Sequence, residues 1–253
     1  GHLLTGYFSP LAVRGISTSE RLMASASDLV LAAGEKVRDD LVAAGIVGAD
    51  KVRVVRPGVR DFDRIDAAAA RVQLGAPALR SGAVVAGWLA RVVRVKRPDR
   101  LVGAALRTPE VEYLVGGDGV LREGLDQRAP ANLHSLGWAD PATFWSAVDL
   151  AVLTSDNEAM PYSLVEAGLA GLAAVTTNAG SAAEVVVDGV TGLVVDKDPG
   201  AVAEGVRALV ADAPLRQRMG EAARARALVE FSPERMLGEH RSAYEEALSR
   251  QHS

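Results

Sequence analysis

Two glutamates, Glu158 and Glu166, lie eight positions apart in the segment of the chain best suited to chemistry. Glycoside hydrolysis uses carboxylates in pairs, but a continuous helix would hold these two about 12 Å apart, beyond the roughly 5 to 9.5 Å of hydrolytic pairs. A loop between them would shorten that distance, so a hydrolytic pair stays open. We favour two carboxylates that bind different parts of one long ligand. A solvated loop glutamate and an ordinary helix glutamate are the plain alternative.

The residues around these glutamates predict a phosphate site. The apolar run Leu150–Leu153 indicates a strand, and Pro161 suits the first position of the following helix because its missing N–H needs no partner there. The amides of Ser163 and Leu164 would then be free at the amino end of that helix. Such an end attracts phosphate through its N–H groups and through the helix dipole.

A basic pair, Arg91 and Lys96, follows another predicted strand and precedes a predicted helix. Two cations that reach one anion would neutralise the charge of a leaving diphosphate. A generic basic loop is an equal alternative, because three more arginines lie nearby: Arg94, Arg97 and Arg100.

From residue 83 onward, short apolar runs alternate with helix-like stretches, which is typical of an α/β fold with a Rossmann-like parallel sheet flanked by helices. The runs are mostly unalternating, as strands covered on both faces should be. The predicted strands are 83–88, 111–115, 132–136, 150–153 and 173–176. The predicted helices between them are 97–107, 121–127, 141–147 and 162–170. We expect ligands at the edge where the strand carboxyl ends meet.

The chain divides into four parts, with boundaries at 1–58, 59–80, 81–230 and 231–253. In the first part we predict helices at 18–26 and 35–44 and strands at 28–32 and 51–55. The pair Pro57-Gly58 and the aspartates after it predict a linker region at 59–80. The tail predicts helices at 201–211, 214–229 and 233–250. The first residues show neither an initiator Met nor a signal-peptide pattern, so we expect a fragment of a longer protein.

Composition excludes several classes of protein. The net charge of −4 argues against a nucleic-acid binder, which needs a basic face. The lack of cysteine excludes disulfide scaffolds and Cys-ligated zinc and allows a reducing cytoplasm, where we expect the protein. No apolar run is long enough to cross a membrane. The four histidines lack metal-ligand spacing, and Asp-x-Asp at 61–63 and 196–198 is too common a pattern to predict a metal site.

Several motifs, taken in order, resemble the carboxyl-terminal half of a GT-B glycosyltransferase of group 1, or family 4. The motifs are Arg56-Pro57-Gly58-Val59, Arg91 with Lys96, Gly117-Asp118-Gly119, Leu136-Gly137, Glu158 with Glu166, residues 177–180 leading to Glu184, residues 188–193 and Phe231-Ser232-Pro233. The resemblance implies that residues 1–58 are the remnant of an acceptor domain and that 81–230 bind a nucleotide-sugar. It also implies that the helix within 231–253 crosses back onto the amino-terminal domain.

The resemblance also implies roles for the polar side chains. In similar enzymes the residue matching Glu166 holds the ribose hydroxyls, and the residue matching Glu158 faces the donor sugar. The residues matching Arg91 and Lys96 hold the diphosphate, so we expect no metal and no cofactor. Further nucleotide-sugar contacts fall on Ala159 and Met160 at the sugar, Ser163 and Leu164 at the helix end, and Leu136 and Gly137 at the nucleobase.

The expected activity is retaining transfer of a sugar from a nucleotide-diphosphate sugar, UDP-linked in our prediction, to a glycan, lipid or small-molecule acceptor. The fragment alone would lack the other wall of the cleft. The alternatives are a nucleotide-sugar 2-epimerase or hydrolase, and a nucleotide-binding module without turnover. Peripheral membrane association stays open. His2 lies in a segment similar to one that carries a cleft-facing histidine in related bacterial enzymes.

The glycine-rich segment departs from the family pattern. Ser181 and Ala183 replace the usual second Gly and Pro, and Ala159 stands where a Gly is common. An added methyl beside the sugar would narrow the choice of donor or reduce its affinity.

Overall fold

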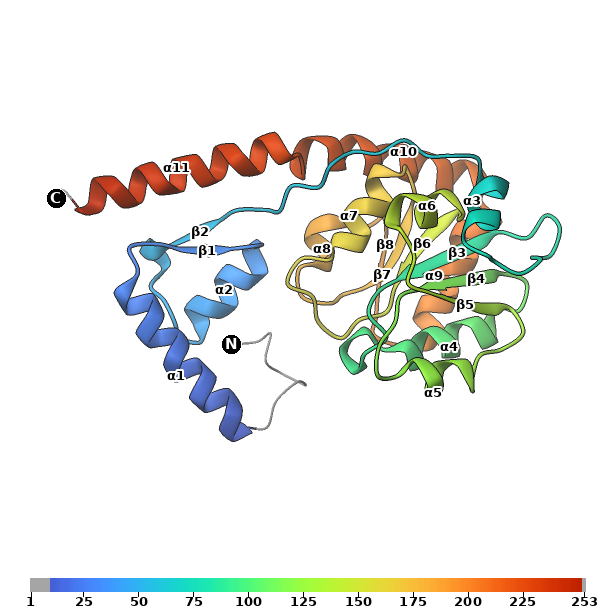
Figure 1. Cartoon of the computed structure of the whole chain (residues 1–253), viewed down its shortest axis with the longest axis horizontal. Coiled ribbons are helices and arrows are strands. Elements are labelled where there is room, and N and C mark those ends of the chain that lie inside the picture. Colours follow the sequence, from blue (N-terminus) through green and yellow to red (C-terminus); the bar gives the residue numbers. More distant parts are fainter. Residues whose placement is uncertain (1–9, 252–253) are drawn as a thin grey trace.

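The computed structural model describes residues 10–251, and its largest part is one sheet of six parallel strands (Figure 1). The strands are β3 (Val85–Leu89), β4 (Glu112–Gly116), β5 (Leu133–Gly137), β6 (Leu150–Leu153), β7 (Ala174–Thr177) and β8 (Gly192–Val195). The predicted α/β class is confirmed, and β8 is an edge strand beyond the five predicted. The sheet order is β5-β4-β3-β6-β7-β8, so the chain winds outward in opposite directions from β3 and from β6.

Helices cover both faces of this sheet. One face carries α6 (Pro141–Ser146) and α7 (Tyr162–Leu169), and the other carries α4 (Pro98–Arg107), α5 (Arg122–Asp126) and α9 (Pro199–Ala211). Alternate strand residues serve the two cores: Leu114 packs on the α6 and α7 side, while Tyr113 and Val115 pack on the α4 and α9 side. Because both faces are buried, the strands carry apolar residues at nearly every position.

A smaller unit precedes the sheet domain, and we call residues 10–55 the amino-terminal unit. It contains α1 (Pro10–Ala26), β1 (Val30–Ala32), α2 (Glu35–Ala43) and β2 (Val52–Val54), with β1 and β2 paired in parallel. Its own apolar cluster includes Ala32, Val37, Ile46 and Val52. In Figure 1 this unit lies beside the strand ends of the sheet domain.

The predicted linker at 59–80 contains a helix that packs on the sheet domain. Residues 67–73 form α3 (Ala67–Gln73), whose Ala70 is fully buried in the core on the α6 face. Asp66 caps this helix by accepting from the amide of Ala69, and Arg71 donates to the carbonyl of Ala147. The alanine run at 67–70 favours a helix, because alanine has the highest helix propensity. Helix α3 within the predicted linker therefore packs on the sheet domain.

The chain ends in α10 (Ala213–Glu230) and α11 (Pro233–Gln251), and α11 reaches the amino-terminal unit (Figure 1). Arg53 donates to Glu246 at 2.8 Å, and Arg250 donates to the carbonyl of Asp50 at 2.8 Å. The last helix therefore lies across both parts of the molecule. Among residues 10–251, no helix combines the length and the apolar character that a membrane crossing requires.

Candidate active site

The carboxyl ends of β3 and β6 bring together two of the predicted site residues. These two strands are neighbours at the centre of the sheet, where the winding changes direction, and open α/β sheets bind ligands at this point. Lys96 follows β3 and Glu158 follows β6, and Lys96 Nζ lies 2.6 Å from Glu158 Oε1. The side chains expose only 17% and 7% of their surface. A cation and an anion thus meet at the position where this fold binds ligands.

Glu158 is held on more than one side. The hydroxyl of Ser155 donates to the same carboxylate oxygen at 2.5 Å, and the carbonyl of Glu158 accepts from the amide of Ser181 at 2.9 Å. Gly180 is required beside it, because a Cβ at that position would lie 2.1 Å from the carbonyl oxygen of Glu158. The sheet edge therefore fixes both the backbone and the side chain of this glutamate.

Arg91 differs from Lys96 in its surroundings. It is exposed, and its guanidinium has no hydrogen bond or ion pair with any residue between 10 and 251. Its backbone carbonyl accepts from the amide of Val93. The loop after β3 thus offers one cation that is already paired and one that is available to an anion.

Glu166 lies inside α7, where it receives a hydrogen bond from Trp145 Nε1 at 3.3 Å. Burial raises the pKa of this carboxyl, the Trp145 hydrogen bond opposes the shift, and the negative charge of Asp140 adds to it. A half-buried carboxylate with one weak donor has capacity for further donors such as sugar hydroxyls. The carboxylates of Glu158 and Glu166 have different hydrogen-bond partners, Lys96 and Ser155 for the first and Trp145 for the second.

The amino end of α7 corrects part of the sequence prediction. Pro161 occupies the N-cap position, without a side-chain capping hydrogen bond, and Tyr162 rather than Pro161 is the first helical residue. The amide of Leu164 donates to the carbonyl of Pro161 at 3.0 Å, so it is not free, and the Leu164 side chain is buried. Within the described chain, the amide of Ser163 has no hydrogen-bond partner, and neither does that of Tyr162. The available amides therefore lie one residue earlier than predicted.

Tight backbone packing surrounds Gly137, the residue predicted for the nucleobase wall. Gly137 takes a φ of +76°, and its carbonyl accepts from the amide of Gly117 at 2.6 Å. A Cβ on Gly117 would lie 2.0 Å from the carbonyl oxygen of Ala90, so the loops after β3, β4 and β5 touch through glycine. Leu136 is half-buried and packs on the core of the α6 face.

The last two predicted positions lie in the loop after β6. The amides of Ala159 and Met160 make no hydrogen bond to any residue from 10 to 251. The Met160 side chain is buried in the core on the α6 face. Ala159 instead packs against the apolar cluster of the amino-terminal unit. This loop therefore touches both parts of the molecule.

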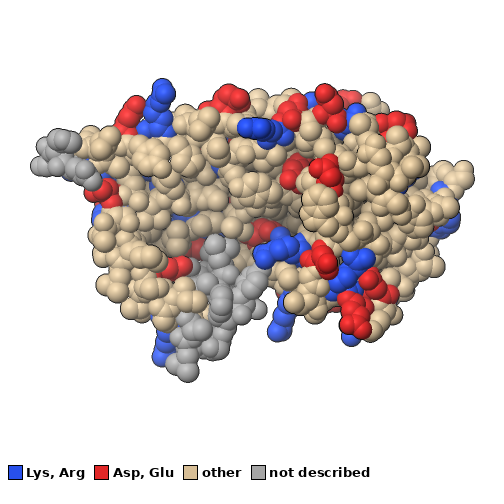
Figure 2. Space-filling view, in the orientation of Figure 1, with Lys and Arg blue, Asp and Glu red and all other residues tan. Residues whose placement is uncertain are grey.

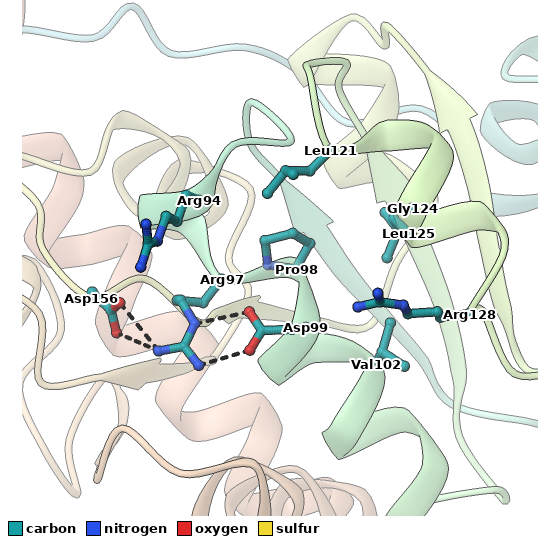
Figure 3. Close-up of a pocket in the computed structure, with 10 residues that line it drawn as sticks. All are labelled: Arg94, Arg97, Pro98, Asp99, Val102, Leu121, Gly124, Leu125, Arg128 and Asp156. Atoms are coloured by element: carbon teal, nitrogen blue, oxygen red, sulfur yellow. Dashed lines mark hydrogen bonds and ion pairs between the residues drawn. The ribbon is translucent and has the colours of Figure 1, made fainter. Parts of the chain in front are cut away.

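Four charged residues that the sequence analysis did not assign to the site anchor its loops. Arg97 binds Asp99 and Asp156 (Figure 3). The buried Arg100 donates to Asp156 at 2.8 Å. The double pairing holds the pKa of the Arg97 guanidinium above its usual value, and Arg97 in turn lowers the pKa of Asp99. Arg97 has a φ of +53°, a left-handed conformation that is costly for a residue with a side chain. The loops after β3 and β6 are thus fastened together next to Lys96 and Glu158.

A cavity of about 560 Å³ lies on the outer side of these loops, between α4 and α5 (Figure 3). Its lining includes Arg94 and Arg128 but none of Arg91, Lys96 or Glu158. On the face shown in Figure 2, basic and acidic side chains are intermixed, with no broad basic surface.

The discounted metal patterns have other structural roles. Asp61 pairs with Arg224 at 2.9 Å, and Asp198 caps α9. His134 lies 2.7 Å from the carboxylate of Glu112. Among residues 10–251, no group of three or more His, Cys, Asp or Glu side chains is arranged to hold a metal. His2 lies outside the described residues.

The fold and this site define a class of protein, a doubly wound α/β domain with its ligand site at the switch point. The model of the family described as glycosyl transferases group 1 matches residues 76–226, and the chain belongs to that family. The predicted resemblance is thereby confirmed.

Curated relatives agree with this assignment. The D-inositol 3-phosphate glycosyltransferase of Mycobacterium sp. (strain KMS) is 31% identical over 222 residues, which cover 80% of this chain and 49% of that protein. The D-inositol 3-phosphate glycosyltransferase 2 of Catenulispora acidiphila is 34% identical over 228 residues, which cover 78% of this chain and 51% of that protein. The chain spans about half the length of the curated relatives it matches.

Among solved structures, sucrose-phosphate synthase from Thermosynechococcus elongatus aligns with a TM-score of 0.82 at 22% identity, covering 94% of this chain and 62% of that one. Anabaena HepE in complex with UDP aligns with a TM-score of 0.80 at 23% identity, covering 96% and 69%. These likenesses establish the GT-B fold.

Proposed function

We propose that this chain carries the donor half of a retaining glycosyltransferase that uses a UDP-linked sugar. The observation that supports the proposal best is the meeting of Lys96 and Glu158 at the switch point of the sheet, 2.6 Å apart and largely buried. Exposed Arg91 lies in the same loop as Lys96, and half-buried Glu166 follows Glu158 in the chain. This set provides cations for a diphosphate and carboxylates for hydroxyl groups.

In the proposed reaction, Arg91 and Lys96 stabilise the negative charge that develops on the leaving UDP. Such stabilisation is strongest where the charges are held in place and water is excluded, and the Lys96 side chain exposes only 17% of its surface. Lys96 must exchange its contact with Glu158 for one with the diphosphate, or share its three donors between them. Glu158, with the amides of Ala159 and Met160, would then face the sugar, and Glu166 would accept from the ribose hydroxyls. The mechanism requires no metal and no cofactor.

We further propose a small-molecule acceptor that binds in the cleft on the side of the amino-terminal unit. The name of the matched relatives, which act on D-inositol 3-phosphate, supports a small acceptor over a glycan or a lipid. HepE, solved with UDP, supports UDP as the nucleotide of the donor. We propose a cytoplasmic location, where nucleotide-sugars are available.

Calorimetric titration with UDP tests the donor site. Binding by the unaltered chain is expected, with affinity reduced about 10- to 100-fold in Lys96→Ala, because a hydrogen bond to a charged group is lost. Glu204→Ala is the control, since Glu204 is exposed on α9 and has no ion pair within the described chain. Equal UDP affinity in all three proteins would refute the assignment of Lys96. Sugar analysis after incubation with UDP-sugar alone separates a transferase, which leaves the sugar unchanged, from an epimerase.

A further inference from the structure

Helix α2 of the amino-terminal unit lacks a cap from its own sequence. Its N-cap is Gly34, which offers no side-chain acceptor, whereas Ser, Thr, Asp or Asn usually fills this position. The first amides of a helix need an acceptor from elsewhere when their own cap residue supplies none. In this molecule the acceptor comes from the sheet domain.

Glu184 of α8 (Ala182–Val185) supplies both acceptor oxygens. Its Oε2 accepts from the amide of Glu35 at 2.8 Å, and its Oε1 accepts from the amide of Lys36 at 2.9 Å, across 149 and 148 residues of sequence. Only 16% of the Glu184 side chain is exposed, and Arg56 lies 3.9 Å from Oε2. A carboxylate at a helix amino terminus is also favoured by the helix dipole.

The fit between these parts is close. A Cβ on Gly34 would lie 2.9 Å from both Glu184 Oε1 and the hydroxyl oxygen of Ser181. Gly34 therefore leaves room for the Glu184 carboxylate, since a side chain at residue 34 would occupy the same space. On its other side, Glu184 is held to α10, because Arg226 donates to its carbonyl at 2.9 Å.

The same short segment contacts the loop that carries Glu158. The amide of Ser181, three residues before Glu184, donates to the carbonyl of Glu158 at 2.9 Å, and Gly180 packs directly against it. Ala159, the next residue of that loop, packs on the apolar cluster of the amino-terminal unit. Continuous contacts thus run from α2 through Glu184 and Ser181 to Glu158 and Lys96.

We infer that Glu184 is a positioning residue that joins the amino-terminal unit to the sheet domain and so fixes the Glu158 loop. It is not among the residues proposed to bind the donor. The importance of that loop rests on the proposed function, but the physical link between α2, Glu184 and residues 155–160 does not.

Hydrogen exchange on the whole chain without ligand tests the inference separately from UDP binding. Glu184→Ala is expected to speed exchange at residues 35–36 on the order of tenfold. It should also speed exchange at the two amides that fasten the Glu158 loop, those of Asp156 and Ser181, while strands β3 and β4 stay unchanged. Glu204→Ala is the matched control and should change none of these amides. Unchanged exchange in Glu184→Ala either at 35–36 or at Asp156 and Ser181 would overturn the inference.

A double variant separates positioning from simple capping. Gly34→Ser with Glu184→Ala gives α2 a local cap, with the Ser181 side chain rotated away from the added Cβ, but does not restore the link to the sheet domain. Protection at residues 35–36 should return while exchange at Asp156 and Ser181 stays fast. If both segments regain their protection, Glu184 acts only as a helix cap and its positioning role is refuted.

Discussion

Glu158 and Lys96 bind each other in the structure, so each must release or share this contact before it can bind the donor. Because the ammonium of Lys96 is 2.6 Å from the carboxylate, a diphosphate must draw it away or share it. Glu158→Gln removes this competing charge, so we expect UDP to bind several-fold more tightly, the opposite of the effect of Lys96→Ala. The same change should destabilise the chain by about 3 kcal/mol, because a largely buried cation loses its partner. Calorimetry and thermal unfolding measure the two effects, and weaker UDP binding in Glu158→Gln would contradict the assignment of Lys96.

Glu166 links pH to both stability and binding. Burial raises the pKa of its carboxyl above the unfolded value, so its stabilising contribution is present below the unfolded pKa and is lost as pH rises through the folded pKa. Glu166→Gln should therefore raise the unfolding temperature at neutral pH, with a smaller gain in acid. It should also weaken UDP binding, because a neutral amide accepts less strongly from ribose hydroxyls. Thermal scans across pH and UDP titrations check both results, and a lower unfolding temperature at neutral pH would contradict the argument.

At the scale of single elements, the sequence predicted more of the sheet than of the contacts between loops. Apolar runs such as Leu150–Leu153 identify strands because burial on both faces requires apolar residues at consecutive positions. No local sequence pattern predicts the direct pairing of Lys96 with Glu158, since that pairing depends on β3 and β6 being neighbours. The contact of Glu184 with α2 is equally hard to predict from the sequence, because its one local sign is Gly34 at a position where a capping side chain is usual.

The turn that precedes α4 holds Arg97 in a strained backbone conformation, and the cost of that strain can be measured. Arg97 takes a left-handed conformation there and binds Asp99 and Asp156. Arg97→Ala and Arg97→Gly lose the same ion pairs, but only the alanine keeps a Cβ at positive φ. We expect the glycine variant to be more stable by about 1 kcal/mol, or about 2 to 4 °C in Tm for a chain of this size. Equal Tm values would mean that the turn relaxes when the ion pairs are lost.

At the scale of the whole molecule, the two parts are joined where the chain leaves β2 and meets the start of α11. The amide of Val59 donates to the carbonyl of Phe231 at 2.8 Å, and Gly58 approaches so closely that a Cβ would lie 2.6 Å from the backbone of Pro233. An added methyl at residue 58 would press on the backbone of Pro233 at the start of α11, the helix that reaches the amino-terminal unit. We therefore expect the relative position of the two parts to depend on this glycine, which lies outside the site.

Gly58→Ala should therefore loosen the junction and destabilise the chain by about 1 to 3 kcal/mol, the usual cost of overpacking. Gly238→Ala is the matched control, because Gly238 lies within α11 with nothing within 4 Å of an added Cβ. That change should stabilise the helix by about 0.5 to 1 kcal/mol. Thermal unfolding measures both, and limited proteolysis should cut Gly58→Ala faster near residues 55–60 than either the control or the unaltered chain. Equal cleavage in all three proteins would show that the junction tolerates the extra methyl without separating the two parts.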